Sequence, residues 1–207
     1  MVGLNKSIVR VMLMTSYIVV IALIISGISA LFAYLNTGAD RSAMLHTEIK
    51  KIEQYSPKVV WAPIENEGRL IDEENLKALE NDYLDAWYVK HIAYKTNTTI
   101  GIKDYYTDSA RLNLFEIIEL NTDKHITIES TTLEHHPTLE FFSEDGQLAV
   151  ITDRDVVEYK RVFQNKKIRL ETTEISTYKI VLLLEDGFWR IRHLVKETTK
   201  NYEVEHM

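Results

Sequence analysis

Five side chains could take part in acid–base chemistry: Tyr83, His135, His136, Asp153 and Asp155. A general base must lie within hydrogen-bond reach of the proton that it removes, in a pocket that excludes water. His135 and His136 are neighbours, so in a strand their side chains point to opposite faces and cannot both line one pocket. The sequence HHP that contains them is also consistent with a break in a strand.

The remaining candidates also have structural interpretations. Asp153 and Asp155 share a face of a regular strand, but Arg154 between them and a suspected bulge favour a solvent-exposed kink. Tyr83 belongs to the apolar face of a predicted helix, with Trp87 one turn later. We therefore expect no catalytic residue. Candidates for lining a pocket, without a catalytic role, are Tyr83, Trp87, His135, Asp153 and Asp155.

Composition excludes several other kinds of chemistry. The 207 residues contain no cysteine, which excludes disulfides, a thiol nucleophile and a cysteine-based zinc site. The seven histidines show no metal-binding spacing, and the seven glycines form no phosphate-binding loop. The net charge of −7 argues against a nucleic-acid partner, since the basic residues of YKRVFQNKKIR alternate with apolar ones. We expect no metal and no cofactor.

Residues 11–35 carry no charged side chain and predict a transmembrane helix. At about 1.5 Å per residue such a helix crosses the ~30 Å hydrocarbon layer with some tilt. Cleavage near TGA, as a signal peptide, is the alternative, but the apolar run is longer than such peptides need. The tail 1–10 holds Lys6 and Arg10 and no acid. It is therefore expected in the cytoplasm of a bacterium, with the rest of the chain outside the inner membrane.

Residues 36–71 form a juxtamembrane connector. Leu45, Ile49 and Ile52 recur at helical spacing before Pro57, and this stripe must be covered by the chain's own domain, the membrane interface or a partner. Trp61 lies on an extended stretch between two prolines. It is expected either to close the surface of its own domain or to contact a partner.

Residues 72–197 predict an α+β domain, and residues 198–207 a C-terminal tail. A helix capped by Asp72 carries an apolar face that includes Tyr83 and Trp87. One or two shorter helices follow, with a buried side marked by Leu112, Phe115 and Ile118. After His125, β-branched residues predict four long antiparallel strands with turns at EDG, QNK and EDG. The helices should pack on one face of this curved sheet.

The order of these elements resembles the nuclear-transport-factor-2-like fold. The resemblance is carried by the helix NLKALENDYLDAWYVKHIAY, by YYTDSA at residues 105–110 and by the final strand DGFWRI at residues 186–191. It implies helices over a concave sheet that encloses a pocket, in which enzymes of this fold place Asp, His and Tyr. It implies no particular function, because the fold serves enzymes, binding modules and scaffolds.

The sequence therefore predicts a non-enzymatic accessory or scaffold subunit of a bacterial envelope complex, held in the membrane by one anchor. An integral-membrane partner is expected, either a glycosyltransferase that makes or exports polysaccharide or a component of a type IV secretion-like system. A membrane-tethered enzyme or small-ligand binder that uses the pocket is the third interpretation. Formation of a homo-oligomer is left open.

Overall fold

The computed structural model describes residues 14–17, 19–21, 23–28 and 55–201. The chain divides into two compact units, residues 1–44 and residues 45–207. In the first unit the described residues are helical and their side chains are exposed. No helix among the described residues combines the length and the apolar character that crossing a bilayer requires. Much of the predicted span, namely residues 11–13, 18, 22 and 29–35, lies outside the described residues.

The second unit begins its helical layer with α3, Glu73–Thr96. Asp72 caps this helix as predicted, because its Oδ1 atom accepts a hydrogen bond of 2.8 Å from the Asn75 amide. The helix ends at Asn97, whose left-handed backbone (φ 51°) stops further helical turns. Its buried face supplies much of the hydrophobic core.

Two shorter helices follow, α4 (Ile102–Tyr105) and α5 (Asp108–Asp123). On α5 the buried face repeats every four residues through Ala110, Leu114 and Ile118. The prediction that Leu112 is buried was wrong: it lies on the opposite side of this repeat and is 58 % exposed. Phe115 is half-buried and packs at the margin of the core.

The sheet contains four long antiparallel strands: β3 (Ile126–Phe142), β4 (Leu148–Gln164), β5 (Lys167–Glu185) and β6 (Phe188–Asn201). They are adjacent in chain order, and the turns fall at the three predicted sites. Strand β3 runs without a break through Pro137, so the alternative of a break at HHP was wrong. The register shifts between Glu134 and His136, and Pro137 itself pairs with Asp153 in regular register.

The connector adds two short strands that the sequence analysis did not predict. β1 (Lys58–Val59) and β2 (Glu67–Gly68) pair in parallel with β3, which makes the sheet mixed. Further hydrogen bonds of 3.0 Å join the Val60 amide to the His135 carbonyl and the Ala62 amide to the Pro137 carbonyl. Residues 55–71 thus lie along the outer edge of β3.

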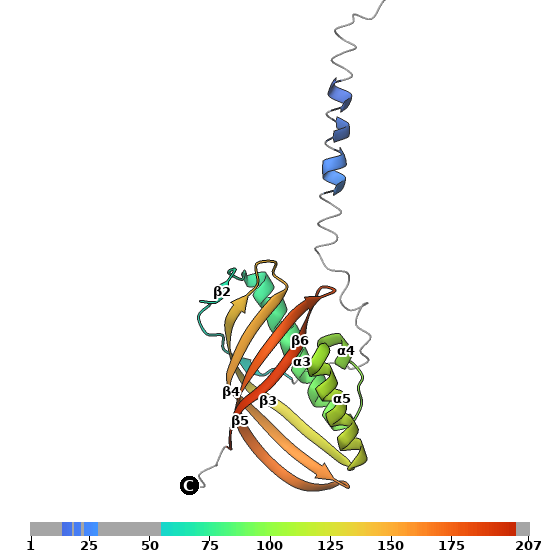
Figure 1. Cartoon of the computed structure of the whole chain (residues 1–207), viewed down its shortest axis with the longest axis vertical. Helices are drawn as coiled ribbons and strands as arrows, with labels where there is room; N and C mark the ends of the chain where they lie inside the picture. The colour runs from blue at the N-terminus through green and yellow to red at the C-terminus, as the bar shows by residue number, and fades with distance from the viewer. Residues whose placement is uncertain (1–13, 18, 22, 29–54, 202–207) are drawn as a thin grey trace, which may run out of the picture. The chain divides into compact units, whose positions relative to one another are not determined.

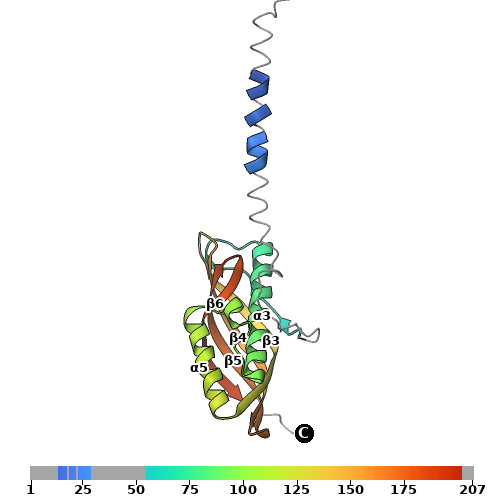
Figure 2. The same ribbon diagram turned by 90° about the vertical axis from the view of Figure 1, so that its right-hand side faces the viewer.

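The helices gather on one side of the strongly twisted sheet (Figures 1 and 2). The backbone of α3 approaches β3 and β6, the outer strands of the four, and α5 approaches the same two. The central strands β4 and β5 therefore line the floor of a concavity that side chains fill from both layers. Trp87, Trp189 and Tyr83 are the largest completely buried side chains.

Candidate functional site

One face of α3 points into the concavity and carries Tyr83, Trp87, Lys90 and Tyr94, at spacings of three and four residues. Tyr83 and Trp87 are completely buried, and Lys90 is 6 % exposed. A lysine so deeply buried is unusual without a charged partner. This face therefore brings both polar and apolar groups to the centre of the fold.

A bulge in β4 decides which acids face these residues. Asp153 pairs with Tyr178 and Val156 pairs with Ser176, so β4 contains one extra residue between these two pairs. Asp155 takes up the irregularity with a left-handed backbone (φ 52°). The prediction of a bulge is confirmed. The expectation that Asp153 and Asp155 share a face was wrong, because the extra residue reverses the alternation: Asp153 is buried and Asp155 is exposed.

Three of the predicted residues meet in one hydrogen-bonded cluster. Asp153 Oδ2 accepts hydrogen bonds from the Tyr83 hydroxyl (2.6 Å) and from His135 Nδ1 (2.7 Å). Asp153 Oδ1 accepts a third bond, of 2.7 Å, from the backbone amide of His136. The side chains of Tyr83, His135 and Asp153 are all 0 % exposed. We name these three residues the Asp153 cluster.

The Asp153 cluster is closed to solvent. Burial, and then the neighbouring Asp153 carboxylate, raises the pKa of Tyr83 well above its usual value, which keeps the hydroxyl protonated as a donor. His135 Nε2 has no hydrogen-bond partner in the described part of the chain, so no acceptor continues the network beyond it. His136, on the opposite face of β3, is partly exposed, as the alternation of a strand requires.

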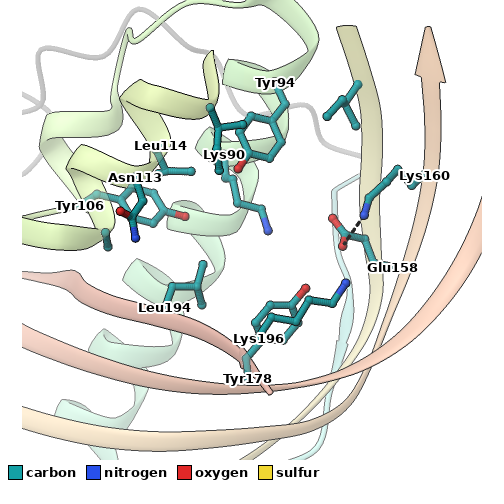
Figure 3. Close-up of a pocket in the computed structure, with 13 residues that line it drawn as sticks. Lys90, Tyr94, Tyr106, Asn113, Leu114, Glu158, Lys160, Tyr178, Leu194 and Lys196 are labelled. Atoms are coloured by element: carbon teal, nitrogen blue, oxygen red, sulfur yellow. Dashed lines mark ion pairs between the residues drawn. The ribbon is translucent and has the colours of Figure 1, made fainter. Parts of the chain in front are cut away.

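A cavity of about 300 Å³ lies farther along the concavity (Figure 3). Three lysines from different elements border it: Lys90 from α3, Lys160 from β4 and Lys196 from β6. The remaining wall is aromatic, aliphatic or amide in character. It consists of Tyr94, Tyr106, Ala110, Asn113, Leu114, Ile117, Ile128, Tyr178 and Leu194, with Glu158 as its only acid.

Two of the three lysines are neutralised by carboxylates. Glu174 Oε2 lies 2.7 Å from Lys196 Nζ and 3.2 Å from Lys160 Nζ, and Glu158 lies 3.7 Å from Lys160. Partial burial alone would raise the pKa of Glu174, but the two ammonium groups lower it overall. Lys90 forms no ion pair or hydrogen bond with any other described residue, and its Nζ lies 3.5 Å from the centre of the Trp87 ring.

The cavity residues were not predicted as a site, although the sequence contains a signal for one of them. Lys90 follows Trp87 by three positions and precedes Tyr94 by four, so it interrupts the apolar stripe of the helix. The sequence alone could not predict which charged side chains of β4 and β6 face the cavity. The bulge and the strand pairings decide which side chains point inward.

The predicted partner contacts are only partly described. Leu45, Ile49 and Ile52 lie outside the described residues. Trp61 is half-buried against the core, and its Nε1 donates a hydrogen bond of 2.7 Å to Glu80 on α3. Trp61 therefore covers part of its own domain, and contact of its exposed part with a partner stays a prediction. Across residues 55–201 and the described N-terminal stretches, no cluster of three His, Asp or Glu side chains could hold a metal ion.

The helices and curved sheet define a nuclear-transport-factor-2-like cone. The intermembrane space region of the chloroplast protein ARC6 is similar, with a TM-score of 0.52, 11 % identity, and coverage of 62 % of this chain and 98 % of that chain. A protein from Novosphingobium aromaticivorans assigned as a scytalone dehydratase matches with a TM-score of 0.42 and 14 % identity, over 64 % and 90 % of the two chains. No protein-family model and no curated protein sequence matches the chain.

Proposed function

We propose that this chain is a non-enzymatic accessory or scaffold subunit of a bacterial cell-envelope complex, anchored in the inner membrane by residues 11–35. The observation that carries the non-enzymatic part of the proposal is the closed Asp153 cluster. Its Asp, His and Tyr are the residue types of an acid–base site, but every one is 0 % exposed and both carboxylate oxygens are engaged within the protein. These groups stabilise the fold and are not free to meet a substrate.

The uncharged run 11–35 supports the membrane anchor, and the basic tail before it supports a cytoplasmic N-terminus. An anchored domain meets its partners at a raised effective concentration, so a scaffold needs no catalytic group. The partner is an integral-membrane protein, either of a polysaccharide-producing complex or of a secretion complex.

Two measurements on the full-length chain test this proposal. Carbonate washing of bacterial membranes should leave the chain in the membrane fraction. Purification in mild detergent should then yield a stoichiometric membrane partner: a glycosyltransferase would identify a polysaccharide complex, whereas a secretion ATPase or channel protein would identify a secretion complex.

Asp153→Asn, which keeps the side-chain size, is the matched variant for catalysis. The recovery of the partner, per folded molecule, should be equal for the variant and the wild type. Release of the chain by carbonate would contradict the anchor, and purification without any partner would contradict the scaffold. A turnover by the wild-type protein that Asp153→Asn abolishes would contradict the non-enzymatic assignment.

A further inference from the structure

We propose that the cavity between α3, α5 and the sheet binds a small organic anion, a carboxylate or phosphate attached to an apolar group, with Lys90 as its most buried cationic contact. This site is separate from the Asp153 cluster and adds ligand binding to the scaffold role.

The balance of charge gives the sign of the ligand. Three ammonium groups, those of Lys90, Lys160 and Lys196, face two carboxylates, those of Glu158 and Glu174. One positive charge is therefore left over. It lies at Lys90, since Glu174 binds the other two lysines directly and Lys90 forms no ion pair within the described part of the chain.

The position of Lys90 makes this charge available to a ligand. Only 6 % of the surface of this residue is exposed. Its ammonium group points from α3 towards the sheet across the cavity (Figure 3). A buried ammonium group without an anionic partner is unfavourable, and an anion in the cavity would supply the missing interaction.

The other walls fit an apolar ligand body with one polar end. Leu114, Ile117 and Leu194 provide aliphatic surface, and Tyr178 and Tyr94 provide aromatic surface. The Asn113 amide and the Tyr94 hydroxyl border the same space and make no hydrogen bond to other described residues, so they can donate to a carboxylate or phosphate oxygen. A volume of about 300 Å³ is at the small end of ligand pockets, which favours a single ring or a short chain.

Fluorine NMR of the full-length chain in detergent tests this proposal, with protein-free micelles as the blank. The anionic probes are 4-fluorobenzoate and 4-fluorophenyl phosphate, and 4-fluorobenzamide is a neutral molecule of nearly the same shape. We expect at least one anion to bind about tenfold or more tightly than the amide. The tighter of the two anions identifies the headgroup as carboxylate or phosphate.

Lys90→Met removes the charge and retains most of the side-chain volume. We expect it to weaken anion binding about tenfold or more and to leave amide binding equal or stronger. Lys103→Met makes the same change in charge on the exposed surface of α4 and should leave both affinities unchanged. Thermal unfolding of both variants establishes that they are folded.

Three results would overturn the proposal. They are the absence of binding by either anion at concentrations up to about 10 mM, equal affinity for anion and amide, and unchanged anion affinity in folded Lys90→Met. None of these results bears on membrane anchoring or partner recovery, so the proposal and the scaffold assignment can fail independently.

Discussion

The ammonium nitrogen of Lys90 lies 3.5 Å from the centre of the Trp87 ring, one turn earlier on the same helix. A cation–π contact of this kind contributes about 0.5–2 kcal/mol, which offsets only part of the cost of burying an ammonium group. Burial accordingly lowers the pKa of Lys90 from 10.5 to about 8, although the Glu158 carboxylate acts in the opposite direction. The protonated form of Lys90 is therefore less favourable in the folded domain than in the unfolded chain.

Lys90→Met should stabilise the domain. Because the thioether side chain fills the same space without a charge, we expect the free energy of unfolding at pH 7 to rise by about 1–3 kcal/mol. Urea unfolding followed by tryptophan fluorescence measures this change. Lys103→Met, at an exposed position, should stay within about 0.5 kcal/mol of the wild type. A less stable Lys90→Met protein would show that the ammonium group stabilises the fold.

The stability difference between Lys90→Met and the wild type should depend on pH. Between pH 8 and pH 10.5 folded wild type has lost the Lys90 proton while the unfolded chain retains it, so wild-type stability rises with pH in this range. The neighbouring groups Glu158, Lys160, Glu174 and Lys196 are present in both proteins, and their effects largely cancel in the difference. We expect the advantage of the variant to be full below pH 8 and mostly lost by pH 10.5. A constant advantage would exclude titration of Lys90.

Substitutions in the Asp153 cluster should lower stability in graded steps. Tyr83→Phe removes one hydrogen bond to a carboxylate and should cost about 1–3 kcal/mol. In Asp153→Asn the new side-chain NH2 group faces hydrogen-bond donors that the carboxylate had accepted from, and this should cost about 2–4 kcal/mol. Asp155→Asn is the control, since this residue is exposed and asparagine tolerates its left-handed backbone. Denaturant midpoints measure all three. Equal stability of the two aspartate variants would contradict the structural role of Asp153.

Trp61→Phe should loosen the connector along β3. The substitution removes the hydrogen bond to Glu80 and part of the packing, at a cost of about 1 kcal/mol. Hydrogen exchange at the Val60 and Ala62 amides, which bond to β3, should become faster. Lys77→Gln removes the other partner of Glu80 and should leave these amides protected. Equal protection in both variants would mean that Trp61 does not secure the connector.

A comparison of Gly68→Ala with Gly187→Ala distinguishes the cost of backbone strain from the cost of steric overlap. Both glycines have positive φ, 84° and 81°, so each alanine should cost about 1–2 kcal/mol from strain alone. At Gly68 an added Cβ would also lie 2.2 Å from the Phe142 carbonyl oxygen, whereas at Gly187 it would meet no atom within 4 Å. We expect Gly68→Ala to lower the melting temperature clearly more than Gly187→Ala. The reverse order would contradict close packing of β2 on β3.

The elements of the domain could be predicted because local signals and tertiary structure agree in them. Asp72 is a capping residue directly before an apolar helical stripe, and the turns between the long strands occur where glycine or asparagine precedes a β-branched run. The short parallel strands were missed because two residues, as at Lys58–Val59, are too few for a periodic pattern.

The functional interpretation of individual residues was less predictable. Asp153 resembled a solvent-exposed residue beside Arg154, and only the tertiary structure shows Tyr83 and His135 arranged around it. The sequence analysis did not single out Lys90. The apolar stripe places this lysine on the inner face of α3, but how deeply it is buried depends on the distance between α3 and the sheet.

The bulge at Asp155 divides β4 between two tasks. Before it, the inward positions of β4 are Ala149, Ile151 and Asp153, all within the tightly packed part of the core; after it, Glu158 and Lys160 border the cavity. The first half of this strand thus packs in the core, and the second half forms part of the cavity wall. Substitutions at Glu158 or Lys160 would therefore change the cavity wall, while the packing around Ala149 and Ile151 stays as it is.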